Sequence, residues 1–336
     1  MGNLAINGLG RIGRAALKIL LDTDGLEVVA VNDLIPPDNL AYLLRYDTVY
    51  GRYQRDVVPQ EDALVIDGRS IPVFAEKDPA ALPWSELNVD LVLECTGVFR
   101  QERDLKKHIT SGARFVILSS PAKTETIATV VPGVNRPEDG EVRIISCASC
   151  TTNCITPLME VMDRRIGVER AVMTTVHAYT ASQRLVDGPD KSFTRGRAGA
   201  ANLVPTSTGA ALATTKALPG LEGRFDGVAL RVPVSVGSIA DVVFVAGRPT
   251  TREEVNDVFR EEAASDRYRE VLGASEDALV SSDIIGDSRA SVVDLHMTRV
   301  VDSTLVKVMS WYDNEWGFTH QMIRQAKEML GVRGSE

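Results

Sequence analysis

Three cysteines lie within one nine-residue stretch, SCASCTTNC, at Cys147, Cys150 and Cys154. Thiols at this spacing could be metal ligands, a redox pair, or one nucleophile with two inert neighbours. A zinc site is disfavoured because no second pair of ligands with suitable spacing accompanies them. A redox couple of Cys147 and Cys150 has the C-x-x-C spacing but lacks the aromatic and proline neighbours usual in such couples. A single thiolate nucleophile therefore explains the cluster best.

Cys150 is the predicted nucleophile because of the elements expected around it. An apolar run at residues 142–145 predicts a strand, and the apolar spacing of residues 152–166 predicts the helix that follows. The positive end of this helix favours the thiolate of Cys150 and lowers the thiol pKa. Cys154, one turn further on, is expected to pack against the core. Pro157 requires that the helix begin late or bend.

A thiol nucleophile needs a base to take its proton, and His177 is the candidate. It stands at the end of the first strand expected in the second half of the chain. His108 and His320 fall in predicted surface helices, and His296 lies in an alternating apolar and polar stretch. A lone histidine is more often structural, so spacing alone leaves both interpretations of His177 open.

A glycine-rich turn predicts phosphate binding. Gly8, Gly10 and Gly13 form a G-x-G-x-x-G sequence directly after a short strand-like run and directly before an amphipathic helix. Such a turn brings backbone amides and the positive end of the helix to a pyrophosphate. Asp33 ends the next apolar run, about 20 residues later, where a carboxylate accepts hydrogen bonds from an adenosine ribose. A structural glycine turn is the alternative. Because Asp33 would repel a 2′-phosphate, the pattern favours NAD over NADP.

Composition limits the class of protein. At 336 residues and 44% hydrophobic content, the chain is expected to form two domains. A net charge of −9 disfavours general binding to nucleic acids or anionic membranes, which needs the opposite sign. No run of about 18 apolar residues and no basic and apolar leader is visible, so we expect a cytoplasmic protein.

The apolar pattern changes along the chain. The first half alternates short apolar runs with amphipathic stretches, which predicts a parallel sheet with crossover helices. Longer, β-branched and partly alternating runs in the second half predict an antiparallel sheet. The expected strands are residues 4–6, 26–31, 91–95, 115–118 and 142–145, then 172–179, 228–236, 239–246 and 304–311. Helices are expected at 12–21, at 251–264 behind a capping box, and at 316–330.

Several segments together resemble phosphorylating glyceraldehyde-3-phosphate dehydrogenase, and the resemblance covers essentially the whole chain. These segments are INGLGRIGR from Ile6, ECTGVF from Glu94, SPAK from Ser120, ASCTTNC from Ala148, PTSTGAA from Pro205, RVP from Arg231 and WYDNEWG from Trp311. The resemblance implies an α/β fold with an N-terminal Rossmann dinucleotide-binding domain at residues 1–149. It implies a second, α+β domain at 150–314, built on a mostly antiparallel sheet and used for catalysis and oligomerisation. A terminal helix at about 315–336 is expected to pack back on the first domain.

The resemblance also implies an activity. This is the NAD-dependent, phosphorylating oxidation of D-glyceraldehyde 3-phosphate to 1,3-bisphosphoglycerate, in glycolysis or gluconeogenesis. Cys150 would attack the aldehyde to form a thiohemiacetal, with His177 as base. Hydride transfer to NAD would leave an acyl thioester, which inorganic phosphate would cleave. A homotetramer without a metal ion is implied as well.

Two anion sites and a cofactor site follow from the resemblance, residue by residue. One phosphate site would contain Ser149, Thr151, Thr208 and Gly209, and the other Thr180, Arg197 and Arg231. NAD would contact the glycine turn together with Arg11, Ile12, Asp33, Lys77, Ser119 and Asn314. Without the resemblance, the two arginines could be ordinary surface or strand residues, and Lys77 a solvated lysine.

Some residues depart from the family pattern, and two rival functions stay open. Cys147 stands where asparagine is common, and oxidation could link it to Cys150 if the geometry permits. The loop at residues 187–200 is altered around Asp190 and Thr194. An erythrose-4-phosphate dehydrogenase is the nearest enzymatic rival, although PTSTGAA favours the glyceraldehyde branch. A non-catalytic, dinucleotide-binding redox sensor is the rival from another class, but such a sensor has no use for two anion sites.

Overall fold

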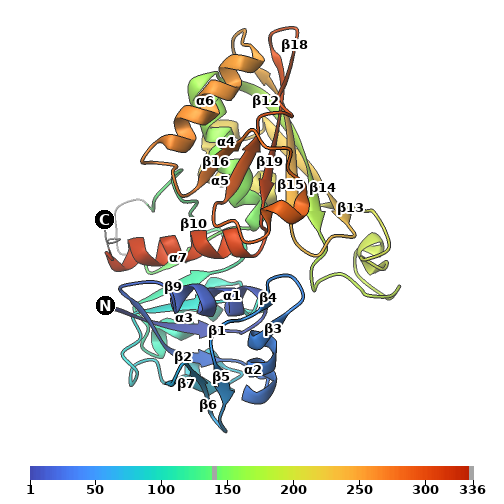
Figure 1. Cartoon of the computed structure of the whole chain (residues 1–336). Helices are drawn as coiled ribbons and strands as arrows, with labels where there is room; N and C mark the ends of the chain where they lie inside the picture. Colours follow the sequence, from blue (N-terminus) through green and yellow to red (C-terminus); the bar gives the residue numbers. More distant parts are fainter. Residues whose placement is uncertain (138–141, 333–336) are drawn as a thin grey trace. The chain divides into compact units, whose positions relative to one another are not determined.

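The computed structural model describes residues 1–137 and 142–332 and divides the chain into two compact units (Figure 1). The first unit consists of Met1–Val130, Pro137–Ala148 and Met322–Glu336, and the second of Val131–Arg136 and Ser149–Gln321. The break between Ala148 and Ser149 falls inside the cysteine cluster, so Cys147 belongs to the first unit and Cys150 to the second.

The first unit is built on a nine-stranded sheet. Its order is β10 (Ala128–Thr129), β11 (Ile144–Ser146), β9 (Phe115–Leu118), β8 (Leu91–Glu94), β1 (Gly2–Asn7), β2 (Leu26–Asn32), β7 (Arg69–Phe74), β6 (Ala63–Ile66) and β5 (Val57–Pro59). The strands from β10 to β7 are parallel, and β6 and β5 continue the sheet in antiparallel pairing. β8 is fully buried, as expected of a parallel strand covered on both faces. The predicted parallel α/β unit is confirmed.

Helices α1 (Arg11–Leu20), α2 (Pro37–Arg45) and α3 (Glu102–Thr110) belong to this unit, with the hairpin β3 (Tyr46–Asp47) and β4 (Gly51–Arg52) and the 3-10 turn η1 (Pro79–Ala81). α1 begins directly after the glycine turn and buries Ala16, Leu17 and Leu20. α3 is a surface helix, as expected, but His108 lies on its inner face and is fully buried. The side chain of His108 points inward to meet the indole N–H of Trp84 at 3.0 Å.

The second unit has a mostly antiparallel sheet, as predicted. Its order is β13 (Val204–Ser207), β14 (Phe225–Val232), β12 (Val168–Ala178), β15 (Ser238–Ala246), β19 (Leu305–Tyr312), β17 (Ser291–Asp294) and β16 (Leu272–Ser275), with β18 (Arg299–Val301) beside β19. Only the pairs β12 with β14 and β16 with β17 are parallel among the described strands of this sheet. Alternate residues of β12 are buried and exposed, which is typical of a sheet covered on one face.

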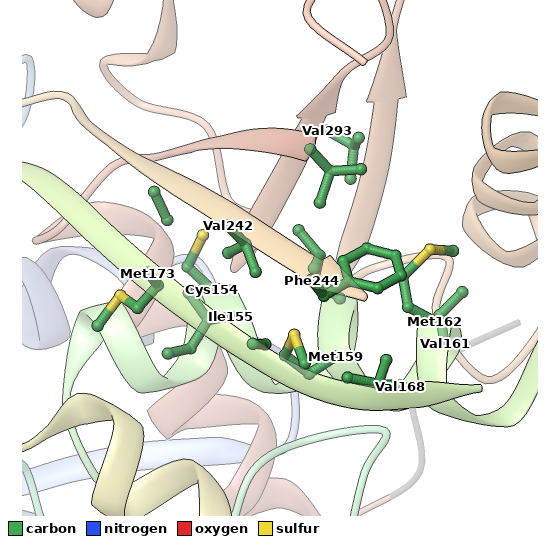
Figure 2. Packing of buried hydrophobic residues seen from close by; sticks show 14 of the residues in the cluster. Cys154, Ile155, Met159, Val161, Met162, Val168, Met173, Val242, Phe244 and Val293 are labelled. Carbon is green, nitrogen blue, oxygen red and sulfur yellow. The ribbon is translucent and has the colours of Figure 1, made fainter. Parts of the chain in front are cut away.

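Helices α4 (Cys150–Arg165), α5 (Ala210–Ala217) and α6 (Arg252–Ala264) pack with this sheet. Short 3-10 turns lie at η2 (Phe193–Gly196), η3 (Pro219–Leu221) and η4 (Ser281–Ile284). Figure 2 shows Cys154, Ile155 and Met159 of α4 gathered with Val242 and Phe244 of β15, and all five side chains are almost completely buried. Cys154 is therefore a core residue, as expected.

The ends of the helices follow from particular residues. The side chain of Thr251 caps α6 by accepting a hydrogen bond from the amide of Glu254 at 3.2 Å. α4 begins at Cys150, so of the two alternatives that Pro157 left open, a late start or a bend, the late start is wrong. Pro157 lies inside the helix and has no N–H to donate to the preceding turn, but this part of α4 is completely buried and held by packing on both sides.

The C-terminal helix α7 (Trp316–Leu330) has the bounds predicted from its apolar spacing. Its residues up to Gln321 belong to the second unit, and those from Met322 belong to the first. Within residues 1–137 and 142–332, no helix has both the length and the apolar character that crossing a membrane requires.

Candidate active site

Cys150 is the first residue of α4. The side chain of Ser149 caps this helix by accepting a hydrogen bond from the amide of Thr152 at 3.1 Å. Ala148, just before the cap, has a φ of 58°, a left-handed conformation that residues other than glycine rarely adopt. The short turn between β11 and α4 therefore places a thiol at the positive end of a 16-residue helix.

His177 faces this thiol. Cys150 Sγ and His177 Nε2 are 3.4 Å apart, within the distance for a hydrogen bond to sulfur. Sheet register explains the third member, because β12 and β14 run parallel and pair His177 with Arg231. Arg231 Nη1 lies 2.5 Å from His177 Nδ1 and 2.9 Å from the carbonyl oxygen of Ala178. A thiol, an imidazole and a guanidinium group thus meet at the ends of three elements.

The tautomer of His177 decides what it can do. Nδ1 lies 2.7 Å from the carbonyl oxygen of Ala178, to which it can only donate a proton. The contact with Arg231 requires the opposite tautomer, because a guanidinium group only donates. With its proton on Nδ1, the ring presents an unprotonated Nε2 to Cys150. Only this tautomer gives the thiol a base.

The charge states follow from burial. Burial raises the pKa of the Cys150 thiol, while the charge of Arg231 and hydrogen bonds from Thr151 partly oppose the rise. Burial and the charge of Arg231 lower the pKa of His177 to about 3. The backbone amide at the start of the helix has the predicted effect on the thiol, but burial outweighs it, so the expected lowering of the thiol pKa is wrong. At neutral pH a thiol therefore faces a neutral imidazole.

A pocket of about 460 Å³ surrounds this pair. The N-terminal ends of α4 and α5 both reach it, at Cys150 and Gly209, and each brings backbone amides and a partial positive charge. Two guanidinium groups add full charges. The pocket is lined by Ser149, Cys150, Thr151, Thr175, His177, Asp190, Lys191, Ser192, Arg195, Thr206, Ser207, Thr208, Gly209, Ala229 and Arg231. This arrangement can bind a tetrahedral anion next to the thiol.

The structure brings most of the predicted site residues of this unit together, but not all. Thr180 and Arg197 do not line the pocket. The hydroxyl of Thr180 lies 2.8 Å from that of Ser182, and Arg197 is 61% exposed and bonded to Asp187 at 2.8 Å. Arg195 lines the pocket instead and donates to the hydroxyl of Thr206 at 2.9 Å.

Tyr312 supports the site without having been predicted. Its hydroxyl lies 2.9 Å from that of Thr151 and 2.7 Å from that of Thr175, and all three groups are buried. Its ring meets that of His177 edge-on at 5.9 Å. Asn314, two residues later, accepts hydrogen bonds on Oδ1 from Gly237 N and Ser238 Oγ, at 3.2 and 2.9 Å. These bonds orient the amide so that Nδ2 is the group it can offer to a ligand.

The first unit has a separate pocket of about 390 Å³ at the glycine turn. Gly8 has a φ of 94°, and a Cβ on Gly13 would lie 1.9 Å from the carbonyl oxygen of Gly8. Both positions therefore need glycine for the fold of the turn itself. A Cβ on Gly10 would meet nothing within 4 Å, so Gly10 is the residue that keeps space open for a ligand. This division of roles fits a turn that receives a pyrophosphate.

Asp33 and Lys77 line this pocket with Gly8 and Gly10, whereas Gly13 does not line it. Asp33 accepts hydrogen bonds from the amide of Leu9 at 2.6 Å and from that of Ile35 at 2.9 Å, which hold its carboxylate at the end of β2. Arg11, Ile12 and Ser119 are not among the lining residues; Arg11 pairs with Asp47 at 2.5 Å. The full lining is Asn7, Gly8, Leu9, Gly10, Arg14, Asn32, Asp33, Leu34, Ile35, Glu76, Lys77, Cys95, Thr96, Val98 and Phe99.

Cys150 differs from the other thiols. Cys95, Cys147 and Cys154 have raised pKa values because burial disfavours their thiolates, and for Cys95 the pKa rises to about 12. Cys150 is the cysteine whose contact with an imidazole is described here, and the described structure places none of the four cysteines in a disulfide. No group of three or more His, Cys, Asp or Glu side chains in the described residues could hold a metal ion. An oxidative link between Cys147 and Cys150 stays a prediction.

The fold and the two pockets are those of a two-domain, dinucleotide-binding dehydrogenase, with the glycine turn in one unit and a thiol beside an imidazole in the other. Comparison with known proteins gives the family. Residues 2–102 match the model for the glyceraldehyde 3-phosphate dehydrogenase NAD binding domain, and residues 149–314 match that for the C-terminal domain. The chain belongs to the glyceraldehyde-3-phosphate dehydrogenase family, and it is an oxidoreductase that binds NAD.

Individual relatives agree along nearly the whole chain. The glyceraldehyde-3-phosphate dehydrogenase of Kitasatospora aureofaciens is 50% identical over 336 aligned residues, which cover 99% of this chain and 100% of the relative. Glyceraldehyde-3-phosphate dehydrogenase 2 of Streptomyces avermitilis is 46% identical, covering 95% and 96%. The enzyme of Clostridium pasteurianum is 44% identical, covering 96% and 97%.

Asp33 gives a direct test of cofactor choice. We expect Asp33→Ala to narrow the preference for NAD over NADP, because it removes the charge that would repel a 2′-phosphate and the acceptor for a ribose hydroxyl. The ratio of kcat/KM for the two cofactors measures the effect. Asp38→Ala is the matched control, since it removes the same charge from an exposed position outside the pocket. An unchanged ratio of kcat/KM for NAD and NADP in Asp33→Ala would mean that Asp33 does not bind the ribose.

Proposed function

We propose that this chain catalyses the NAD-dependent, phosphorylating oxidation of D-glyceraldehyde 3-phosphate to 1,3-bisphosphoglycerate. The observation that carries the proposal is the contact of 3.4 Å between Cys150 Sγ and His177 Nε2 inside a cationic pocket. Names of the relatives point to the same substrate. The reaction belongs to glycolysis or gluconeogenesis, and we place it in the cytoplasm.

In the first step, Cys150 Sγ attacks the aldehyde carbon while its proton passes to His177 Nε2. The new C–S bond uses the thiol electron pair, and the C=O pair moves to oxygen. The imidazolium of His177 then donates to this oxygen, giving a thiohemiacetal. Because the resting imidazole is neutral, it is in the form that this step requires.

In the second step, His177 takes the hydroxyl proton of the thiohemiacetal as the carbon gives up its hydride. Bound NAD supplies the hydride acceptor. The product on Cys150 is an acyl thioester, which retains much of the free energy of the oxidation. Asn314, whose amide is oriented by Gly237 and Ser238, is proposed to hold the carboxamide of the cofactor.

In the third step, an oxygen of inorganic phosphate attacks the thioester carbonyl, and the C–S bond breaks. The sulfur leaves as the Cys150 thiolate, an acyl phosphate is released, and the thiolate takes back the proton held on His177, which restores the thiol and the neutral imidazole. The hydroxyls of Ser149, Thr151 and Thr208, the amide of Gly209 and the side chain of Arg195 are proposed to hold one of the two phosphates. Arg231 is proposed to serve the other. Thr180 and Arg197 remain predictions, for which the pocket gives no support.

NADH formation from glyceraldehyde 3-phosphate, with and without inorganic phosphate, tests the proposal. We expect oxidation that depends on phosphate. Absence of NADH formation by folded, reduced protein would favour the redox sensor. A higher kcat/KM with erythrose 4-phosphate would replace the proposed substrate.

Arg195 and Arg197 give a matched pair of variants. We expect Arg195→Met to raise the KM for inorganic phosphate about ten- to hundredfold, because it removes a charged hydrogen-bond donor from the pocket. Arg197→Met removes the same charge two residues away, outside the pocket, and should change this KM little. Steady-state kinetics with varied phosphate make the measurement. A raised KM for phosphate in Arg197→Met, with little change in Arg195→Met, would mean that Arg197 is the residue that binds phosphate.

We also propose a homotetramer. Support for an assembly comes from large apolar side chains that are exposed in the second unit, among them Leu185 at 83%, Val186 at 74% and Phe193 at 90%. These residues lie in or next to the loop that contributes Arg195 and Asp190 to the pocket. A neighbouring subunit that covers them would therefore also hold the wall of the active site in place.

A further inference from the structure

A buried polar chain adjoins the cofactor pocket, and the proposed reaction does not use it. It joins the ends of three neighbouring strands, β8, β1 and β2, to helix α3. Its side chains are those of Glu94, Asn7, Asn32 and His108, none more than 5% exposed. Buried polar groups in such a chain are costly unless each has a partner, so their arrangement needs a reason.

Trp84 fixes the tautomer of His108. The indole Nε1 of Trp84 lies 3.0 Å from His108 Nδ1, and an indole N–H can only donate. Nδ1 therefore carries no proton. The proton of the neutral ring is on Nε2, which lies 3.2 Å from Glu94 Oε2. His108 is thus a neutral donor to Glu94 and not the cation of an ion pair.

Backbone groups fix the other end of the chain. The amide of Glu76 donates to Asn32 Oδ1 at 2.8 Å, and its carbonyl accepts from Asn32 Nδ2 at 3.0 Å. Asn32 Nδ2 also donates to Asn7 Oδ1 at 2.7 Å, so Asn7 Nδ2 must point the other way. It donates to Glu94 Oε2 at 2.5 Å. Both ends of the chain therefore direct donors at the same carboxylate oxygen.

The second oxygen of Glu94 holds the wall of the cofactor pocket. Oε1 accepts from the amide of Thr96 at 2.8 Å and also from the hydroxyl of Thr96. Four donors therefore converge on the two oxygens of Glu94. Thr96 and Asn7 line the pocket, whereas Glu94 and His108 do not. Thr96 also lies close against the glycine turn, because a Cβ on Gly8 would be only 2.8 Å from Thr96 N.

We propose that Glu94 and His108 are positioning residues for the dinucleotide. Neutral His108 holds the carboxylate of Glu94 in place, and the two oxygens of Glu94 hold Asn7 and Thr96 at the separation that bound NAD requires. A displaced Thr96 would move the glycine turn, and a rotated Asn7 would present the wrong amide atom to the ligand. This inference rests on the NAD pocket and on no step of the proposed reaction.

Glu94→Gln tests it with little change of shape. The NH₂ group of the new glutamine cannot accept a hydrogen bond. In one orientation it faces the N–H of Thr96, and in the other it faces the donors of Asn7 and His108, so two donors face each other in either orientation. We expect the Kd for NAD, titrated without aldehyde, to rise about ten- to hundredfold. The KM for NAD should rise in parallel, while kcat at saturating NAD and the KM values for aldehyde and phosphate change little.

Leu105→Ala is the matched control. Leu105 is fully buried in the same helix, three residues before His108, and its truncation lowers stability without removing any donor or acceptor of the polar chain. We expect a lower Tm and an unchanged Kd for NAD. If Glu94→Gln does not fold, His108→Phe removes the donor to Glu94 while filling the space, and its Kd for NAD should rise in the same direction. An unchanged Kd for NAD in whichever of these two variants folds, or an equal rise of this Kd in Leu105→Ala, would mean that the buried polar groups have only a structural role.

Discussion

Cys150→Ser is expected to abolish turnover with glyceraldehyde 3-phosphate, while NAD binding stays close to that of the wild type. A hydroxyl ionises far less readily than a thiol, and the neutral imidazole of His177 is too weak a base to offset the difference. The acyl intermediate would also become an oxygen ester, which phosphate cleaves less readily than a thioester. We expect kcat/KM to fall by a factor on the order of 10⁴ or more.

Cys154→Ser is the control for this variant, because it makes the same replacement one turn further along α4. Cys154 is buried in the core, with Sγ 3.7 Å from Ser291 Oγ and 3.8 Å from the carbonyl oxygen of Ser310. A hydroxyl there keeps polar neighbours, so we expect some loss of stability and nearly normal kcat. Phosphate-dependent NADH formation and an NAD titration distinguish the two variants. Equal losses of activity in both, or a Cys150→Ser enzyme that retains most of its turnover, would contradict the assignment of the nucleophile.

Local sequence patterns predicted the longest elements of this protein but missed others, among them α2, α5 and β13. The apolar run at Phe115–Leu118 and the helical spacing at Trp316–Leu330 match β9 and α7, because in both cases burial of the whole pattern decides the structure. Thr251 caps α6 because a threonine hydroxyl satisfies an amide that the helix itself leaves unpaired. The start of α4 was harder to predict. Proline disfavours a helix interior locally, and only the tertiary packing around Pro157 compensates for this.

Side-chain direction in irregular segments could not be predicted in the same way. Arg195 and Arg197 are two residues apart, and their order in the sequence does not say which one faces the pocket. The 3-10 turn Phe193–Gly196 decides it, because Arg195 lies within the turn and Arg197 leaves it in an extended conformation toward Asp187. No periodicity signals so short a turn.

Contacts between residues that are distant in sequence set a second limit on what can be predicted from the sequence. The polar composition of α3 predicts a surface helix, and the hydrogen bonds of His108 with Trp84 and Glu94, both distant in sequence, explain why its ring turns inward. Similarly, the role of His177 depends on the length of β12 and on its parallel register with β14, which brings in Arg231. The residue types at the site were predicted from motifs, whereas the contacts between them come from sheet register.

The replacement His177→Asn tests the base of the reaction. We expect kcat/KM at neutral pH to fall by roughly 10²- to 10⁴-fold, because asparagine keeps a polar side chain of similar reach but cannot take the thiol proton. Arg197→Met, which alters charge in the same unit outside the pocket, should lie close to the wild type in the same assay.

The pH dependence of the two enzymes separates a base from a merely structural histidine. Burial and Arg231 lower the pKa of His177 to about 3, so its imidazole stays neutral at all ordinary assay pH values and the wild type should lack an inflection near the usual histidine pKa. Burial raises the pKa of Cys150, so in His177→Asn the thiolate must form by direct loss of the proton to solvent. The rate of this variant should therefore rise with pH, and its deficit relative to the wild type should shrink. The alkylation rate of Cys150 measured across the same pH range should show the same trend. A deficit that is constant with pH in both measurements would mean that His177 shapes the pocket without moving the proton.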